Sequence, residues 1–427
     1  MQKRRVHFVN SESAKPSIRF SVIVSAVLGA CSFGSFHAQG QQPSDTSPIY
    51  DNPFRVVAAP ANPAAINALA PNPDTERKEP TTILESPIES VVYLEKLPSQ
   101  TDRPVVTAIS VSPDSELIAA AGDDHAIRLV SMKSGKTIST LQGHVDWVQA
   151  VEFSADGKRL ASCGNDGQLK IWSIDSEPKL VATHRVGHAL QTLAFLGNEE
   201  IFTAGFGNNL YRLHINNAAI NVFHACECSD IRSIACSPDL QWVAFGGRDG
   251  VLRIRTTQVE SASQAAALPP QNGHADTAEH TANLHSDRIR SIQFSSDGQQ
   301  ITSVGEDRRI VHYDLALRKP FGQTEIGGGK LMGLCQLEPN LFAIAGADNT
   351  IRIFSDMNHR VLVKLVGHDG SVTVLKKTPR YIVSGSYDTT IRIWDIDRAI
   401  SSTDSQGLYK HPVAAQFEDS GAGDQIK

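Results

Sequence analysis

Residues 384–396 read SGSYDTTIRIWDI, and a Gly-His pair, Gly367-His368, precedes Ser384 by sixteen residues. Ser384, Asp388 and His368 are the three side-chain types of a serine-hydrolase triad. The same types could also form a structural hydrogen-bond network. A nucleophilic site would occur once in the chain, whereas a structural network would recur. The rest of the sequence distinguishes the two.

Asp388 belongs to a repeat of about 41 residues. Its counterparts are Asp124, Asp166, Asn208, Asp249, Asp307 and Asp348, at intervals of 42, 42, 41, 58, 41 and finally 40 residues to Asp388 itself. The long interval contains a polar insertion at about 258–278. Seven units of similar length are therefore present.

Each unit predicts four short strands. In the second unit an alternating apolar run at 147–153 precedes the turn SADG, and RLASCG follows at 159–164. The recurrent Asp lies in the next turn, LKIW forms a third strand, and a looser fourth strand covers 180–186. Four antiparallel strands per repeat make one propeller blade, so we predict an all-β, seven-bladed β-propeller.

The Gly-His pairs Gly143-His144, Gly187-His188 and Gly367-His368, with Trp394-Asp395 ending a third strand, resemble the WD-repeat β-propeller family. The resemblance covers about residues 89–398, and we assign 89–400 to the propeller. The last unit lacks a fourth strand, and Glu89–Leu97 stands alone before the first unit. The resemblance implies that this segment closes the ring by completing blade seven.

The apparent triad recurs on three blades with an aromatic residue six positions after the Asp. The sets are His144, Ser162, Asp166 and Trp172; His285, Ser303, Asp307 and Tyr313; and His368, Ser384, Asp388 and Trp394. In the family this set is a structural hydrogen-bonded tetrad, so we predict no catalytic residue. The other blades lack the full set, and we expect them to depend more on apolar packing.

Cations also recur on the third strands. They are Arg128, Lys170, Arg212, Arg253, Arg352 and Arg392. We expect their stems to cover apolar surface while their charged groups lie in water.

Function must come from exposed positions, because a propeller fold does not dictate one. We expect the residue before each recurrent Asp to lie on the narrow top face. In unit three, where Asn208 replaces the Asp, this residue is Gly207. The residues just before the first strands should lie on the same face. The predicted partner-binding residues are Trp147, Asn165, Arg248, Arg288, Glu306 and Tyr387. Trp147 could instead pack against a neighbouring blade.

The main hypothesis is a non-enzymatic, monomeric scaffold for a protein or peptide partner. The alternative is a propeller with a small-molecule or metal site, enzymatic or not, at the channel mouth. Such a site needs a unique cluster of His, Asp and Glu. His125 lies beside Asp123 and Asp124, but nothing in the sequence converges with them.

The amino-terminal region indicates export. Residues 1–38 contain basic residues followed by the apolar run FSVIVSAVLGA, which is typical of a signal peptide. Lipidation of Cys31, ordinary cleavage near Gly34 and retention as an anchor all fit this pattern. We predict a periplasmic, envelope or extracellular protein whose only membrane association is amino-terminal. Residues 39–88 read as a disordered tether, and 401–427 as a flexible tail.

Charge and cysteines limit the remaining possibilities. The net charge of −6, with 20% charged residues of both signs and no block of five or six like charges, argues against nucleic acid as a partner. His224, Cys226 and Cys228 form the only metal-like cluster, HACEC, and it lacks a further ligand at zinc spacing. We therefore predict no metal and no cofactor, and a disulfide is the other possibility for these cysteines.

Overall fold

The computed structural model describes residues 83–85 and 88–404, except 99, 218, 227, 229 and 259–278. The predictions for 1–38, for Cys31, for residues 39–82 of the tether, for the insertion at 259–278 and for residues 405–427 lie outside the described residues.

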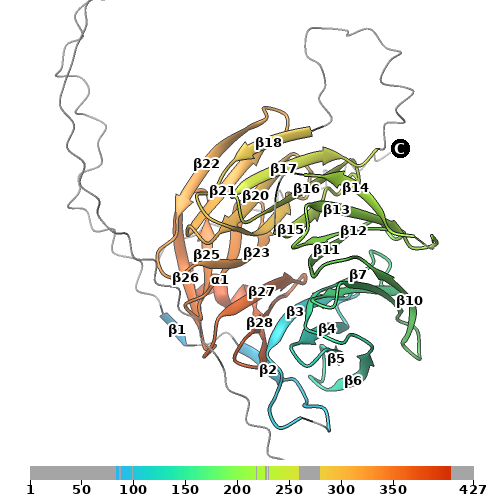
Figure 1. The fold of residues 1–427 in the computed structure, drawn as a ribbon. Helices are drawn as coiled ribbons and strands as arrows, with labels where there is room; N and C mark the ends of the chain where they lie inside the picture. The colour runs from blue at the N-terminus through green and yellow to red at the C-terminus, as the bar shows by residue number, and fades with distance from the viewer. Residues whose placement is uncertain are drawn as a thin grey trace, which may run out of the picture. The chain divides into compact units, whose positions relative to one another are not determined.

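The described chain forms seven sheets, each with four antiparallel strands, arranged as blades around a central axis (Figure 1). Blades one to three comprise β3 (Val106–Val111), β4 (Leu117–Gly122), β5 (Ala126–Ser131) and β6 (Thr137–Gln142); β7 (Val148–Phe153), β8 (Arg159–Gly164), β9 (Gln168–Ser173) and β10 (Lys179–Arg185); and β11 (Leu190–Leu196), β12 (Glu200–Gly205), β13 (Asn209–His214) and β14 (Asn221–Ala225).

Blades four to seven continue the order. They comprise β15 (Ile231–Cys236), β16 (Trp242–Gly247), β17 (Val251–Thr256) and β18 (Glu279–Asn283); β19 (Ile289–Phe294), β20 (Gln300–Gly305), β21 (Arg309–Asp314) and β22 (Lys319–Glu325); β23 (Leu331–Glu338), β24 (Leu341–Gly346), β25 (Ile351–Ser355) and β26 (Arg360–Val366); and β27 (Val372–Lys377), β28 (Tyr381–Ser386), β29 (Thr390–Asp395) and β2 (Ile88–Tyr93). The predicted seven-bladed propeller is confirmed.

Burial follows the position of a strand within its blade. The second strands are nearly continuous apolar runs, as in β4, where five of six residues are buried, because neighbouring blades cover both faces. The fourth strands alternate, as in β6, because one face meets water. Apolar clusters join successive blades, and the first strands contact one another around the ring, including β27 against β3.

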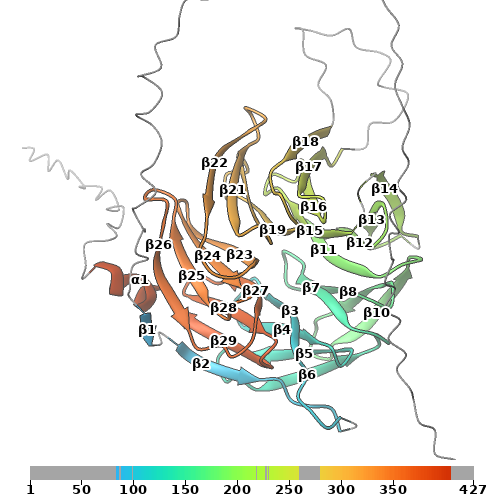
Figure 2. The same ribbon diagram turned by 60° about the vertical axis from the view of Figure 1, so that its left-hand side comes forward.

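The amino-terminal strand closes the ring. β2 pairs antiparallel with β29, with Val91 opposite Arg392 and Tyr93 opposite Thr390. It therefore supplies the fourth strand of blade seven, and it ends at Tyr93 rather than Leu97. A preceding strand, β1 (Ile83–Glu85), pairs in parallel with β26 of blade six. The short segment from β1 to β2 thus spans two blades (Figure 2).

A helix that the sequence pattern did not indicate follows the last blade. α1 (Ile396–Asp404) crosses the predicted propeller boundary at residue 400, and Ile396, Ala399 and Ile400 are buried in an apolar cluster shared by blades six and seven. It covers part of β26. Within the described residues, no helix combines the length and the apolar character required to cross a membrane.

Candidate functional site

The recurrent Asp shapes the turn between the second and third strands. Its carboxylate accepts the backbone N–H two residues later, at 3.0 Å from Gln168 to Asp166 and 2.9 Å from Thr390 to Asp388. The intervening residue has a left-handed φ, +66° at Gly167 and +70° at Thr389. The turn depends on this hydrogen bond from the backbone to the side chain. Asp, which has a short side chain with an acceptor oxygen, therefore recurs there, including in blades that lack the His.

In blade two the four predicted residues form one hydrogen-bonded chain. The Asp166 carboxylate can only accept, so the Nδ1–H of His144 donates to it at 2.8 Å. His144 Nε2 lies 2.8 Å from the hydroxyl of Ser162, which also accepts the indole N–H of Trp172 at 2.8 Å. Each polar group therefore has a partner in a buried environment.

Blade seven repeats this chain. His368 lies 2.7 Å from Asp388 and 2.8 Å from Ser384, which accepts the indole N–H of Trp394 at 2.8 Å. Burial would raise the pKa of Asp388, but hydrogen bonds from His368, Thr390 and a backbone N–H hold that pKa well below its usual range. The carboxylate is therefore ionised at neutral pH.

Blade five has a shorter version of the chain. His285 lies 2.9 Å from both Asp307 and Ser303, and burial lowers the pKa of His285. Tyr313 is buried, but no hydrogen bond from its hydroxyl to Ser303 is found among the described residues. The three serines of these sets, Ser162, Ser303 and Ser384, are each 0% exposed, so a substrate could not reach them in the closed blade.

Three blades without the His use an Arg instead. Arg128 pairs with Asp124, Arg253 with Asp249, and Arg352 with Asp348, four residues apart in each case. In blade six, burial would raise the pKa of Asp348, but the hydrogen bond and charge of Arg352 lower it to about 2. Blades one, four and six, which we expected to depend more on apolar packing, therefore also retain a charged partner for the recurrent Asp.

The expectation that the charged groups of the third-strand cations lie in water is wrong for three of them. Arg128, Lys170 and Arg352 are 1%, 3% and 2% exposed. Lys170 donates to the hydroxyl of Thr183 at 3.1 Å. The signal that identifies the ion pairs is Asp-x-x-x-Arg in a unit that lacks the preceding His.

A second recurring contact identifies the residues at one end of the ring. In blades two to seven, the residue after the second strand donates its backbone N–H to the carbonyl of the residue before the first strand. The pairs are Asn165 with Trp147, Phe206 with Ala189, Arg248 with Asp230, Glu306 with Arg288, Ala347 with Lys330 and Tyr387 with Ser371. All lie at the same end of their blades, here called the top face.

The predicted partner-binding residues differ in exposure. Trp147 and Tyr387 are 43% and 48% exposed. Asn165 accepts the side-chain amide of Gln191 at 2.9 Å, and Glu306 is nearly buried. The sequence alignment missed Phe206, which is 48% exposed and occupies the position assigned to Gly207, one residue away. We call Trp147, Phe206 and Tyr387 the aromatic arc.

A channel of about 680 Å³ runs along the first strands. Its lining includes the second residue of every first strand: Thr107, Gln149, Gln191, Arg232, Arg290, Met332 and Thr373. These residues lie one step inside the top face. The exposed lining is mainly polar, with cations contributed by Arg232 of blade four, Arg290 of blade five, and Lys376 and Lys377 of blade seven.

Ion pairs connect blades four, five and six at the channel mouth. Asp230 contacts Arg232, and it lies 3.3 Å from both Arg248 and Arg288. Arg288 continues to Glu306 at 2.9 Å, and Glu306 also contacts Arg290 and Lys330.

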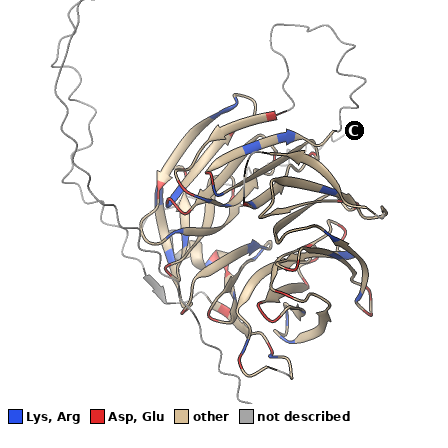
Figure 3. Ribbon diagram, viewed as in Figure 1, with Lys and Arg blue, Asp and Glu red and all other residues tan. Residues whose placement is uncertain are grey.

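This network changes the acidity of Glu306. Burial would raise the pKa of Glu306, but Lys330, Arg290 and Arg288 lower it to about 2. Over the propeller as a whole, residues of both charges are spread among the blades (Figure 3).

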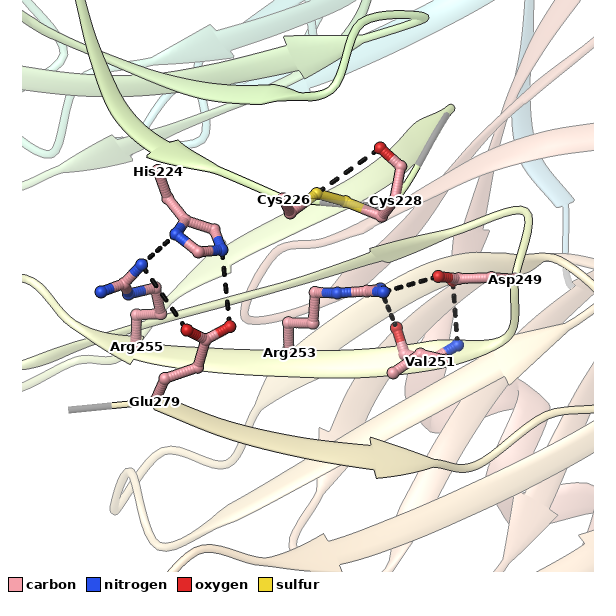
Figure 4. The surroundings of a disulfide bond; sticks show 8 residues. All are labelled: His224, Cys226, Cys228, Asp249, Val251, Arg253, Arg255 and Glu279. Carbon is pink, nitrogen blue, oxygen red and sulfur yellow. Dashed lines mark hydrogen bonds and ion pairs between the residues drawn. A yellow bond between two sulfur atoms is a disulfide. The ribbon is translucent and has the colours of Figure 1, made fainter. Parts of the chain in front are cut away.

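Cys226 and Cys228 form a disulfide after β14, and both are buried (Figure 4). His224, the third member of HACEC, lies 3.4 Å from Glu279 and contacts Arg255. It points to these groups and not to the two sulfurs. Across the described ranges no group of three His, Cys, Asp or Glu side chains is arranged to hold a metal ion.

Five segments of the chain match the family model described as WD domain, G-beta repeat. They are residues 92–131, 135–173, 218–255, 277–314 and 359–395. Each runs from a fourth strand through the first three strands of the next blade, and the first begins within β2. Blades one, two, four, five and seven are covered in this way.

Several curated proteins are similar to this chain. Apoptotic protease-activating factor 1 of Danio rerio is 25% identical over 61% of this chain and 19% of its own length. A ribosome biogenesis protein WDR12 homolog of Chlamydomonas reinhardtii is 24% identical over 54% and 58%, respectively. Nuclear distribution protein nudF 1 of Talaromyces marneffei is 24% identical over 75% and 64%. The chain covers less than two thirds of the length of these relatives.

The prediction that the protein is exported is wrong. The similar proteins are named for ribosome biogenesis, nuclear distribution and apoptotic protease activation, which are processes of the cell interior. A periplasmic, envelope or extracellular location does not fit these relatives. An apolar run after basic residues is too short a pattern to establish export against them.

Proposed function

Because the chain is a WD-repeat β-propeller, we propose that it is a non-enzymatic scaffold that binds a protein or peptide partner on its top face. The observation that carries the proposal is the aromatic arc. Trp147, Phe206 and Tyr387 belong to three blades, occupy the same end of each, and are 43% to 48% exposed. Exposed aromatic side chains on a rigid frame are typical anchors of protein interfaces.

The surroundings of the arc support this role. Val145, in the same loop as Trp147, is 71% exposed, which extends the apolar surface in blade two. The guanidinium of Arg232 lies 4.6 Å from the ring centre of Phe206 and fixes one side of that ring. One relative is named as a protease-activating factor, a name that describes action on another protein.

Affinity capture with a double variant tests the proposal. Wild type and Trp147→Ala/Tyr387→Ala would serve as baits in extract of the source organism, with quantitative mass spectrometry as readout. We expect at least one protein to be retained by the wild type and lost from the variant. Thermal unfolding of the variant should match the wild type, because both side chains are about half exposed.

The matched control removes apolar side chains of similar exposure elsewhere. Ile138 and Leu317 are each 62% exposed and belong to the outer parts of blades one and five. Ile138→Ala/Leu317→Ala should retain the same proteins as the wild type. Identical capture by all three baits would refute the assignment of the binding face.

A further inference from the structure

Five cations gather beside the channel mouth on blades four to six. They are Arg232, Arg248, Arg288, Arg290 and Lys330, here called the basic arc. The carboxylates that contact them are Asp230 and Glu306, whose side chains are only 3% and 6% exposed. Arg248 and Lys330 are 62% and 55% exposed. The carboxylates are therefore buried beneath charges that face water.

Nearby carboxylates do not neutralise the excess positive charge of the basic arc. Asp249 and Asp348 are taken up by Arg253 and Arg352 within their own blades. Asp307 is bound to His285, as described above. The exposed Asp287 accepts the backbone N–H of Arg288 at 2.7 Å and is the remaining carboxylate among the described residues of these loops, which do not include Glu227. In the described part of these loops, five cations thus face three carboxylates, and the outer surface of the arc is positive.

The basic arc lies next to two features that a ligand could use. Arg232 and Arg290 line the channel, so a side chain entering from the top face would meet their guanidinium groups. Arg232 also contacts the ring of Phe206, which joins the basic arc to the aromatic arc. An anionic group and an apolar group of one ligand could be bound side by side.

We propose that the basic arc binds an acidic segment of the partner, a peptide with several Asp or Glu side chains. The cations form a row rather than a single cluster: Arg248 reaches Asp230, Arg288 bridges Asp230 and Glu306, and Lys330 reaches Glu306. A row over three blades suits several spaced carboxylates better than one phosphate group. This inference rests on the proposed function and assigns the chemistry of its partner.

Fluorescence anisotropy with a short labelled Glu-rich peptide tests the inference on the full chain. We expect the wild type to bind it at about 0.02 M salt and much more weakly at about 0.2 M, because exposed charges are screened. The Gln counterpart of the peptide should not bind. Arg248→Gln/Lys330→Gln should weaken binding roughly tenfold, since each exposed cation contributes up to about 1 kcal/mol.

The control variant is Lys179→Gln/Arg360→Gln. It makes the same charge change at exposed positions on β10 and β26, which are fourth strands. Its affinity for the peptide should equal that of the wild type. Equal weakening in both variants, or no binding by the wild type, would overturn the inference.

A Gln-based peptide with one phosphoserine distinguishes the source of the negative charge. Tighter binding of this peptide than of the Glu-rich one would overturn the assignment to carboxylates. The capture experiment with Trp147 and Tyr387 does not use these peptides. Failure of the acidic-segment inference therefore leaves the proposed function standing, whereas unchanged capture by the Trp147→Ala/Tyr387→Ala bait refutes the binding face itself.

Discussion

Arg128 and Asp124 form an ion pair in the interior of blade one, with side chains only 1% and 2% exposed. The second contact, from Arg128 Nη1 to the Asp124 carboxylate, measures 3.1 Å. This pair takes the place that the His and Asp occupy in blades two, five and seven. The Arg in blade one and the His in the other three blades each supply a partner for the buried carboxylate that shapes the turn.

Arg128→Met should destabilise the protein by about 3 to 5 kcal/mol, because the buried Asp124 side chain would lose its charged partner. Urea unfolding measures the loss. Adding Asp124→Asn should recover part of it. Arg392→Met is the control, since Arg392 has the same place in blade seven but Asp388 there is bound to His368. A similar loss in the control would contradict the assigned role.

Acid should weaken blade seven through Asp388. The pKa of this carboxyl is lowered in the folded state, so its contribution to stability is complete above the unfolded pKa of about 4 and is lost as pH falls towards the folded value. We expect wild-type stability to decline below about pH 4. Asp388→Asn should be less stable at neutral pH and should decline less in this range. Parallel pH profiles would show that Asp388 is not responsible.

The closing strand can be tested with neighbouring residues on opposite faces. Leu94 follows β2 and is 0% exposed in the cluster shared by blades seven and one, whereas Val91 is 36% exposed. Leu94→Ala should cost about 2 to 4 kcal/mol in unfolding free energy, and Val91→Ala much less. Thermal or urea unfolding gives both values. Equal and small losses would mean that the segment does not close the ring.

Thiol titration tests the disulfide. Burial raises the pKa of Cys163 and Cys335 to about 12 and raises that of Cys236 further, so none should react quickly in the folded protein. The Cys31→Ser variant removes the cysteine outside the described residues. Denaturation of this variant should release three thiols, and reduction should add Cys226 and Cys228. Five thiols without a reductant would exclude the disulfide.

The repeat made the fold predictable, because an interval of 40 to 42 residues recurs five times and each of the seven units carries the same strand pattern. The spacing of His, Ser, Asp and aromatic residue also indicated which side chains would meet in blade two. The ion pairs were missed because Asp-x-x-x-Arg also occurs at Asp388 and Arg392, where the Asp is bound elsewhere. Only the presence or absence of the His in the preceding loop separates the two cases.

Other features depend on information that no local pattern carries. Phe206 was missed because blade three lacks the Trp and the recurrent Asp, so its alignment slipped by one residue. In blade three Leu213 holds the position of Trp172, as their second-strand partners Ile201 and Leu160 show. The charge network was missed because Asp230, Arg288 and Lys330 come from three different blades.

The pairing of β2 with β29 has a consequence for synthesis on the ribosome. Ile88 is among the first residues of the propeller to be made, and its partner Trp394 is among the last. The blade-seven edge that β2 completes does not exist until β29 has been made. Six blades could form in order as they emerge from the ribosome, but the ring can close only after translation has passed residue 395. A ribosome stalled before that point would hold an open ring with unpaired edges at both of its ends.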